Sequence, residues 1–82
     1  MADNEKLLSV DRMQSGQSGV IDSIQGGYGL VKRLSTLGIR HDKRITKISS
    51  MFMRGPVTIE IDRVQVAIGF GMASRIMVKI DE

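Results

Sequence analysis

The sequence predicts a mainly β domain, a small barrel with one short inserted helix, and three features of the chain lead to this class. Apolar and polar residues alternate through Val57–Ile61 and Val64–Ile68, on either side of Asp62-Arg63. A further alternation runs through Arg75–Ile80, close to the end of the chain. Alternation with a period of two is typical of strands with one buried face. The stretch 26–39 instead shows a helical period between glycines.

The first two alternations predict a hairpin with a defined register. A two-residue turn at Asp62-Arg63 places position 61 opposite 64, 59 opposite 66, and 57 opposite 68. All six apolar side chains then share one face of the sheet, which a slip of one residue would destroy. The turn requires positive φ angles, which Asp62 tolerates and Arg63 adopts only with some strain.

The stretch GGYGLVKRLSTLGI, residues 26–39, predicts a short amphipathic helix. Leu30, Leu34 and Leu37 recur at the i, i+4 and i+7 positions and therefore share one face, which Val31 widens. Gly38 follows the last periodic leucine, at a position that favours a left-handed residue. Because a helix this short is not stable alone in water, we expect its leucine face to pack on the sheet.

Several glycines and one proline are assigned structural roles in turns. A glycine-rich segment before a helix can bind phosphate, but the Gly-Lys-Ser/Thr ending of a phosphate-binding loop is absent. We therefore interpret the segment as a tight turn from strand to helix. The residues given such structural roles are Gly26, Gly27, Gly29, Gly38, Gly55 and Pro56.

The rest of the chain completes a barrel of about five strands. Ser18–Ile24 and Lys43–Ser50 are predicted strands, the second with a bulge because Ile45 and Ile48 lie three apart. Phe70–Ser74 is predicted to form a single helical turn. Residues 1–7 are expected to be a flexible tail, and residues 8–82 a single domain.

The order and spacing of these segments resemble one protein family. GGYGLVKRLSTLGI, then GPVTIEI and VQVAIG, and finally ASRIMVKI are similar to the ferrous-iron transport protein A (FeoA) family, and the resemblance extends from Leu8 to Ile80. It implies an SH3-like barrel and a cytosolic accessory role beside a FeoB-type ferrous-iron transporter, which carries a G-protein domain. His41-Asp42 departs from the proline and glycine usual there, although Asp can adopt the same left-handed conformation.

Composition argues against an enzyme and against a metal site built from side chains. The 82 residues include no Cys and a single His, His41, so neither a thiolate site nor a cluster of His ligands can form. No catalytic triad can be assembled with confidence from this set of residues. The start of the chain is not a signal peptide, and no apolar run approaches the roughly 20 residues of a membrane span. We therefore expect a cytoplasmic protein without a cofactor.

Charge and apolar residues together indicate a surface for a partner. Between Lys32 and Arg54 the chain carries seven Lys or Arg residues, Lys47 among them, and only one acid, Asp42. The Met-Phe-Met segment just before Arg54 is an adaptable apolar surface if it is exposed, or a lid over the core if it is not. The residues expected to bind a partner are Lys32, Arg33, Arg40, Lys43, Arg44, Met51, Phe52, Met53 and Arg54.

By the resemblance, the expected partner is the cytosolic region of a FeoB-type transporter. Two alternatives stay open: a small basic barrel that binds nucleic acid, and a metal-responsive regulatory domain like the C-terminal domain of iron-dependent repressors. Nucleic-acid binding is a weaker hypothesis than transporter docking, because only Tyr28 and Phe52 lie in the basic region as aromatic platforms. Whether the protein forms a homo-oligomer is also left open.

Overall fold

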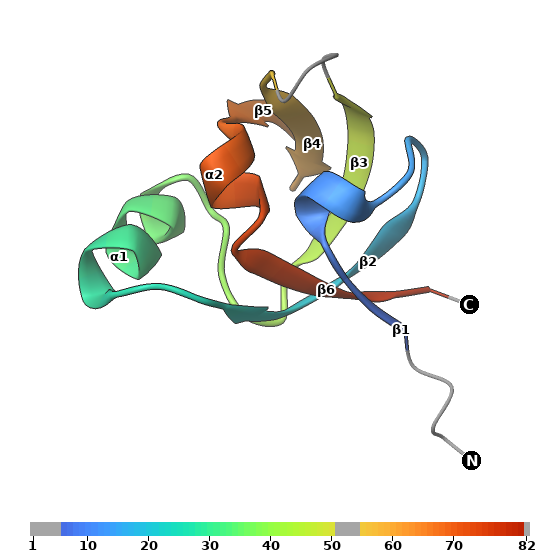
Figure 1. Ribbon diagram of the computed structural model, residues 1–82. Coiled ribbons are helices and arrows are strands. Elements are labelled where there is room, and N and C mark those ends of the chain that lie inside the picture. The colour runs from blue at the N-terminus through green and yellow to red at the C-terminus, as the bar shows by residue number, and fades with distance from the viewer. Residues whose placement is uncertain (1–5, 51–54, 82) are drawn as a thin grey trace.

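The computed structural model describes residues 6–50 and 55–81, which form one antiparallel sheet and three short helical segments (Figure 1). The strands follow the spatial order β1-β6-β2-β3-β4-β5. In chain order the elements are β1 Lys6–Ser9, the 3-10 turn η2 Val10–Arg12, β2 Ser18–Ile24, α1 Tyr28–Thr36, β3 Arg44–Ser50, β4 Val57–Ile61, β5 Val64–Ile68, α2 Phe70–Ala73 and β6 Ile76–Ile80.

The mainly β class is confirmed, with one strand more than the sequence predicted. The additional strand, β1, begins at Lys6 and runs antiparallel to β6, with Lys6 opposite Ile80. The expected tail of residues 1–7 thus overlaps with the first two residues of β1. A four-residue strand with no regular alternation leaves little signal in the sequence, because its stability comes from pairing with β6. Positions 1–5 lie outside the described residues.

The β4–β5 hairpin has the predicted register. Val57 lies opposite Ile68, Ile59 opposite Val66 and Ile61 opposite Val64. Asp62 and Arg63 have φ angles of 53° and 69°, as a two-residue turn of this kind requires. The apolar side chains of β4 are buried, whereas Val64 on β5 is 57% exposed. β5 is the last strand of the sheet, and none of the described strands pairs with it beyond β4.

The bulge predicted in β3 is confirmed, and it lies after Lys47. The register with β4 shifts between Lys47 and Ser49, whereas the pairing is regular from Ile45 to Lys47, so alternation places Lys47 on the same face as the buried Ile45. Lys47 is 1% exposed, and its ammonium group donates to the carbonyl oxygens of Val10, Asp11 and Met13 at 3.0, 3.1 and 2.7 Å. Burial lowers the pKa of Lys47, while Asp11 acts in the opposite direction. Lys47 thus holds η2 against β3 and is not part of the basic surface.

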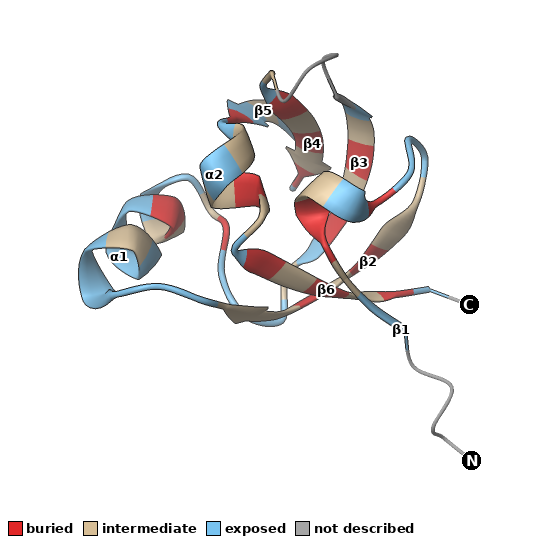
Figure 2. Ribbon diagram, viewed as in Figure 1, coloured by how far each residue is buried: buried red, intermediate tan, exposed pale blue. Residues whose placement is uncertain are grey.

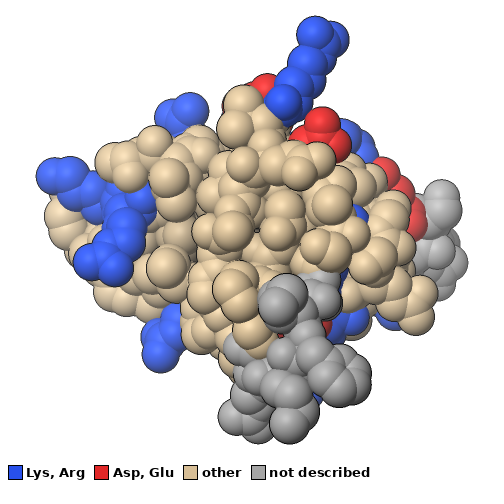
Figure 3. Space-filling view, turned by 90° about the horizontal axis from the view of Figure 1, so that it is seen from above, with Lys and Arg blue, Asp and Glu red and all other residues tan. Residues whose placement is uncertain are grey.

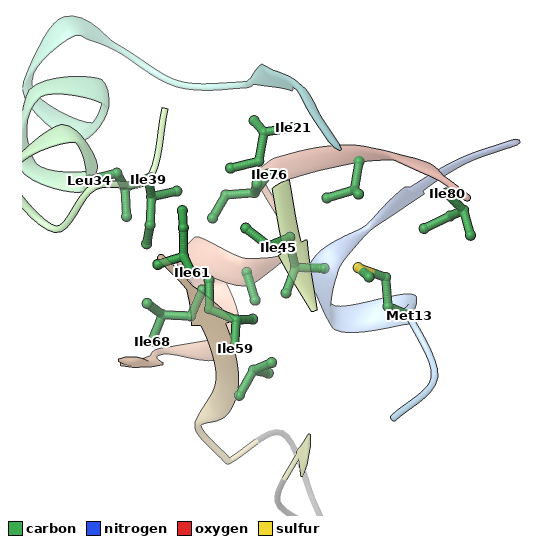
Figure 4. Close-up of a cluster of buried hydrophobic side chains, with 14 residues drawn as sticks. Met13, Ile21, Leu34, Ile39, Ile45, Ile59, Ile61, Ile68, Ile76 and Ile80 are labelled. Atoms are coloured by element: carbon green, nitrogen blue, oxygen red, sulfur yellow. The ribbon is translucent and has the colours of Figure 1, made fainter. Parts of the chain in front are cut away.

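The core lies between the curved sheet and the helices (Figures 2 and 4). Alternate residues of β4 and β6 face it, while the residues between them are only partly covered. The buried cluster comprises Val10, Met13, Ile21, Leu34, Ile39, Ile45, Val57, Ile59, Ile61, Ile68, Ala73, Ile76, Val78 and Ile80. No aromatic side chain among the described residues belongs to this cluster, which is built mainly from Ile, Val and Leu.

Helix α1 packs on the sheet through a narrower face than its leucine spacing predicted. Leu34 is fully buried and Leu30 is partly buried, but Leu37 is 44% exposed. Gly38 has a φ of +85°, as predicted, and its N–H donates to the Ser35 carbonyl at 2.9 Å. The Ile39 N–H donates to the Leu34 carbonyl at 3.0 Å. These two bonds form a Schellman motif, which ends the helix and directs the chain toward β3.

Candidate docking site

A pocket of about 430 Å³ lies where β2, α1 and the connection between α1 and β3 meet. Val31 and Ser35 are one helical turn apart and line the same side of the pocket. Ile39 contributes to its inner wall, because this side chain is fully buried in the core. The lining residues are Asp22, Ser23, Ile24, Val31, Ser35, Ile39, Arg40 and His41.

The pocket combines apolar walls with polar groups from β2 and from the α1–β3 connection. Ile24, Val31 and Ile39 supply the apolar surface. Arg40 and His41 are exposed and bring cationic and imidazole groups to the same pocket. His41 Nδ1 lies 3.3 Å from a carboxylate oxygen of Asp42. The backbone of Asp42 has a φ of 72°, which confirms the left-handed conformation expected at this position. Because Asp22 on β2 and Arg40 both line the pocket, a pocket of this composition suits an apolar side chain flanked by polar groups.

The end of the molecule formed by α1 is also positively charged. Lys32 and Arg33 are exposed on α1, and Arg40 lines the pocket. Lys32 Nζ lies 5.9 Å from the ring centre of Tyr28, a side chain that is itself 79% exposed. Figure 3 shows Lys and Arg side chains gathered at this end of the molecule, on the left of the view, with no Asp or Glu beside them on the visible face.

Two other residues of the expected partner-binding set have acidic partners. Lys43 Nζ lies 2.7 Å from an Asp62 carboxylate oxygen. The Arg44 guanidinium donates to Asp81. Folding brings these acids from the β4–β5 turn and from the end of β6, so the charge asymmetry seen along the chain is reduced in space. Among the described residues, Lys32, Arg33 and Arg40 form no ion pair and are the cations of the set that stay available to a partner.

The apolar part of the expected set cannot be placed in the same way. Met51, Phe52, Met53 and Arg54 lie outside the described residues.

Gly55 and Pro56 immediately precede β4, where a turn was predicted. Gly26 and Gly27 form the entry to α1, and Gly29 lies in its first turn. Of these three glycines, only Gly26 has little space for a side chain, because a Cβ built on it would approach a Leu30 methyl group.

Sequence reasoning did not foresee the pocket. Its apolar walls come from Ile24, Val31 and Ile39, which belong to three separate segments. A single signal was available: Val31 is apolar but lies outside the leucine spacing of α1, and we assigned it to the core face. In the structure Val31 is 38% exposed and lines the pocket.

The described residues contain no group of three or more His, Cys, Asp or Glu that could hold a metal ion. In the same part of the chain, no helix has the length and apolar character needed to cross a membrane. The α1 end carries a pocket, together with cations that form no ion pair among the described residues.

Comparison with known proteins places this architecture in a family. The FeoA domain matches residues 8–80. A protein of Methanocaldococcus jannaschii named "Putative Fe(2+) transport protein A" is 32% identical over 66 residues, which cover 80% of this chain and 78% of that protein. A crystal structure of an iron uptake regulatory protein, FeoA, superposes with a TM-score of 0.87 at 29% identity, and covers 93% of this chain and 100% of that one.

The same fold occurs within larger proteins. A manganese-dependent transcriptional repressor matches with a TM-score of 0.83 at 19% identity, over 93% of this chain and 42% of the repressor. At that identity the likeness concerns the SH3-like fold alone. The family match spans nearly the whole chain, and the M. jannaschii relative and the FeoA crystal structure agree with it. The chain belongs to the FeoA family.

Proposed function

We propose that this protein is a small cytoplasmic accessory protein of ferrous-iron uptake that docks on the cytosolic region of a FeoB-type transporter and modulates it. The observation that carries this proposal is the FeoA domain match over residues 8–80, supported by a relative whose name refers to Fe(2+) transport. In this proposal the chain catalyses no reaction and acts by binding.

The α1 end is the surface that suits such docking. The pocket takes an apolar side chain of the partner, and its walls at Ile24, Val31 and Ile39 would exclude water from that side chain. Lys32, Arg33 and Arg40 complement an acidic rim around it. Because these cations are exposed and form no ion pair among the described residues, they would act mainly on the association rate and on the choice of partner.

The test is calorimetric titration of this protein into the purified cytosolic G-protein region of the cognate transporter. Val31→Asp places a carboxylate on the apolar wall, and Arg40→Glu reverses the charge beside it. We expect each variant to raise the dissociation constant about tenfold or more. Arg12→Glu is the charge-matched control, because Arg12 is exposed on η2 and does not line the pocket.

The outcomes separate the site from the function. Weakened binding by the two pocket variants, with Arg12→Glu unchanged and all variants equally folded by circular dichroism, would support docking at the α1 end. If only Phe52→Ala weakened the binding, the interface would lie at the Met51–Met53 segment and not at the α1 end. Absence of binding with GDP, with a GTP analogue and without nucleotide would refute docking on this region of the transporter.

One observation favours a second candidate function, the binding of single-stranded nucleic acid. Tyr28 is exposed beside Lys32, and a base could stack on its ring while the ammonium group contacts the phosphate backbone. Titration of a fluorescent oligonucleotide at two salt concentrations tests this candidate. Affinity that falls steeply with salt and with Tyr28→Ala would support it, whereas the transporter-docking proposal predicts no such binding.

A further inference from the structure

β5 is an unpaired edge strand at one end of the sheet (Figure 1). It pairs with β4 on one side, and no described strand pairs with its other side. The strand reads Val-Gln-Val-Ala-Ile and contains neither a charged residue nor a proline, the devices with which proteins commonly block edge strands. Val64, Gln65 and Ala67 are exposed.

The hairpin register decides which backbone groups of β5 face outward. In a two-residue hairpin the residues that flank the turn, here Ile61 and Val64, form a hydrogen-bonded pair, and such pairs alternate along the ladder with pairs that are not bonded. Gln65 opposite Glu60 and Ala67 opposite Thr58 are therefore the unbonded pairs. The N–H and C=O groups of Gln65 and Ala67 point away from β4, toward the open edge.

We propose that β5 is a self-association surface, on which a second copy of this chain adds its own β5 in antiparallel orientation. Pairing around a two-fold axis at Val66 places Gln65 opposite Ala67 of the second copy, so the outward-facing groups of each strand meet those of the other. A symmetric contact of this kind closes on itself as a dimer and leaves no edge of β5 open for further growth.

The side chains suit this register. Val64, exposed on the core-facing side of β5, would lie opposite Ile68 of the second copy, at the margin of that copy's core. Arg63, the charged residue next to the strand, would lie opposite Gly69, which has no side chain to obstruct it. The two Arg63 residues lie at opposite ends of the shared ladder, about 20 Å apart at 3.4 Å per residue, where salt screens their repulsion. The strand is thus complementary to itself in this register, and none of its own side chains is charged, which is the reason to choose a second copy as the occupant.

The experiment is sedimentation analysis of the purified full chain from about 1 µM to about 1 mM, a range suited to a short interface. Ala67→Pro removes an outward N–H that the hairpin does not use, so the monomer should fold normally. Val64→Lys places a charge at the seam on a side chain that is already exposed. We expect the wild type to dimerise with rising concentration, and each variant to raise the dimer dissociation constant at least about tenfold.

Two further readouts keep the outcomes distinct. Thermal melting of the variants at low concentration reports whether the monomer is intact. In the wild type, the amides of Gln65 and Ala67 should gain protection from hydrogen exchange as the concentration rises. Arg40→Glu is the control at the α1 end and should leave the dimer unchanged. A wild type that stays monomeric throughout, or a dimer that survives Ala67→Pro and Val64→Lys, would overturn the proposal.

Discussion

The buried Lys47 offers the sharpest prediction about stability. Its ammonium group lies in the interior and donates to three carbonyl oxygens of the η2 segment, at 2.7 to 3.1 Å. Replacing Lys47 with Met keeps most of the aliphatic volume of the side chain but removes every donor. All three carbonyls would lose the Lys47 donor. The Val10 carbonyl would still accept from the N–H of Met13 at 3.2 Å, so the carbonyls of Asp11 and Met13 are the ones most affected.

The expected loss follows from these contacts. A buried acceptor left without a partner costs about 1–3 kcal/mol, and two of the three carbonyls depend chiefly on Lys47. The variant gains in return because the desolvation of an ammonium group, itself worth several kcal/mol, is no longer required. The two acceptors together cost about 2–6 kcal/mol; because this gain and water reaching the exposed side of η2 both reduce that cost, we expect a net loss of about 2 kcal/mol.

Such a loss is large for a chain of this size. At 0.05–0.15 kcal/mol per residue, 82 residues give a free energy of unfolding of about 4–12 kcal/mol. A loss of about 2 kcal/mol should lower the melting temperature by roughly 8–16 °C. Urea denaturation and calorimetry at neutral pH measure both quantities.

Lys43→Met is the matched control, because Lys43 makes a surface ion pair with Asp62 and should lose no more than about 1 kcal/mol. If Lys47→Met loses less than about 0.5 kcal/mol, the cost of burying the charge cancels its hydrogen bonds. Lys47 would then not be the residue that stabilises η2 against β3, and the reasoning above would be refuted.

Three further predictions concern Lys47 and the glycines. Burial lowers the pKa of Lys47 below 10.5 in the folded protein, so between that lowered pKa and 10.5 the unfolded chain binds more protons than the folded one. In this pH range the free energy of unfolding of the wild type should therefore rise with pH relative to that of Lys47→Met, as measured by paired urea titrations. Gly38→Ala should lower the free energy of unfolding by about 1 kcal/mol, because Gly38 has a φ of +85°. Gly29→Ala should instead raise it by up to about 1 kcal/mol, because Gly29 lies in α1 with open space around it. Thermal melting of the two variants checks both signs. Gly19→Ala would place a Cβ 2.2 Å from the Lys79 carbonyl oxygen and should disrupt the β2–β6 pairing, measured as lost amide protection along β6.

The features that could be predicted from the sequence are the local ones. The β4–β5 register follows from alternation because a slip would turn every apolar side chain of the hairpin outward. The end of α1 follows from Gly38, since a left-handed residue is needed there and glycine adopts that conformation freely. Spacing in β3 also indicated a bulge, which the pairing with β4 confirms.

The features that could not be predicted depend on contacts between distant segments. Alternation in β3 places Lys47 on the core face, but lysine rarely occupies such a position, and only the carbonyls of η2 explain it. The pairing of Lys43 with Asp62, and of Arg44 with Asp81, likewise arises only when the sheet forms. Charge counted along the chain therefore overstated the basic surface of the folded protein.

The two proposed surfaces have different consequences when they are considered together. No residue of β5 lines the pocket at the α1 end, so a dimer formed through β5 would leave both pockets open. Such a dimer would bind clustered transporters through two sites and a single soluble G-protein region through one. Ala67→Pro should therefore leave the affinity for the soluble region unchanged but weaken retention on vesicles that carry the transporter at high density. Equal retention of the variant and the wild type would show that docking, if it occurs, uses one pocket at a time.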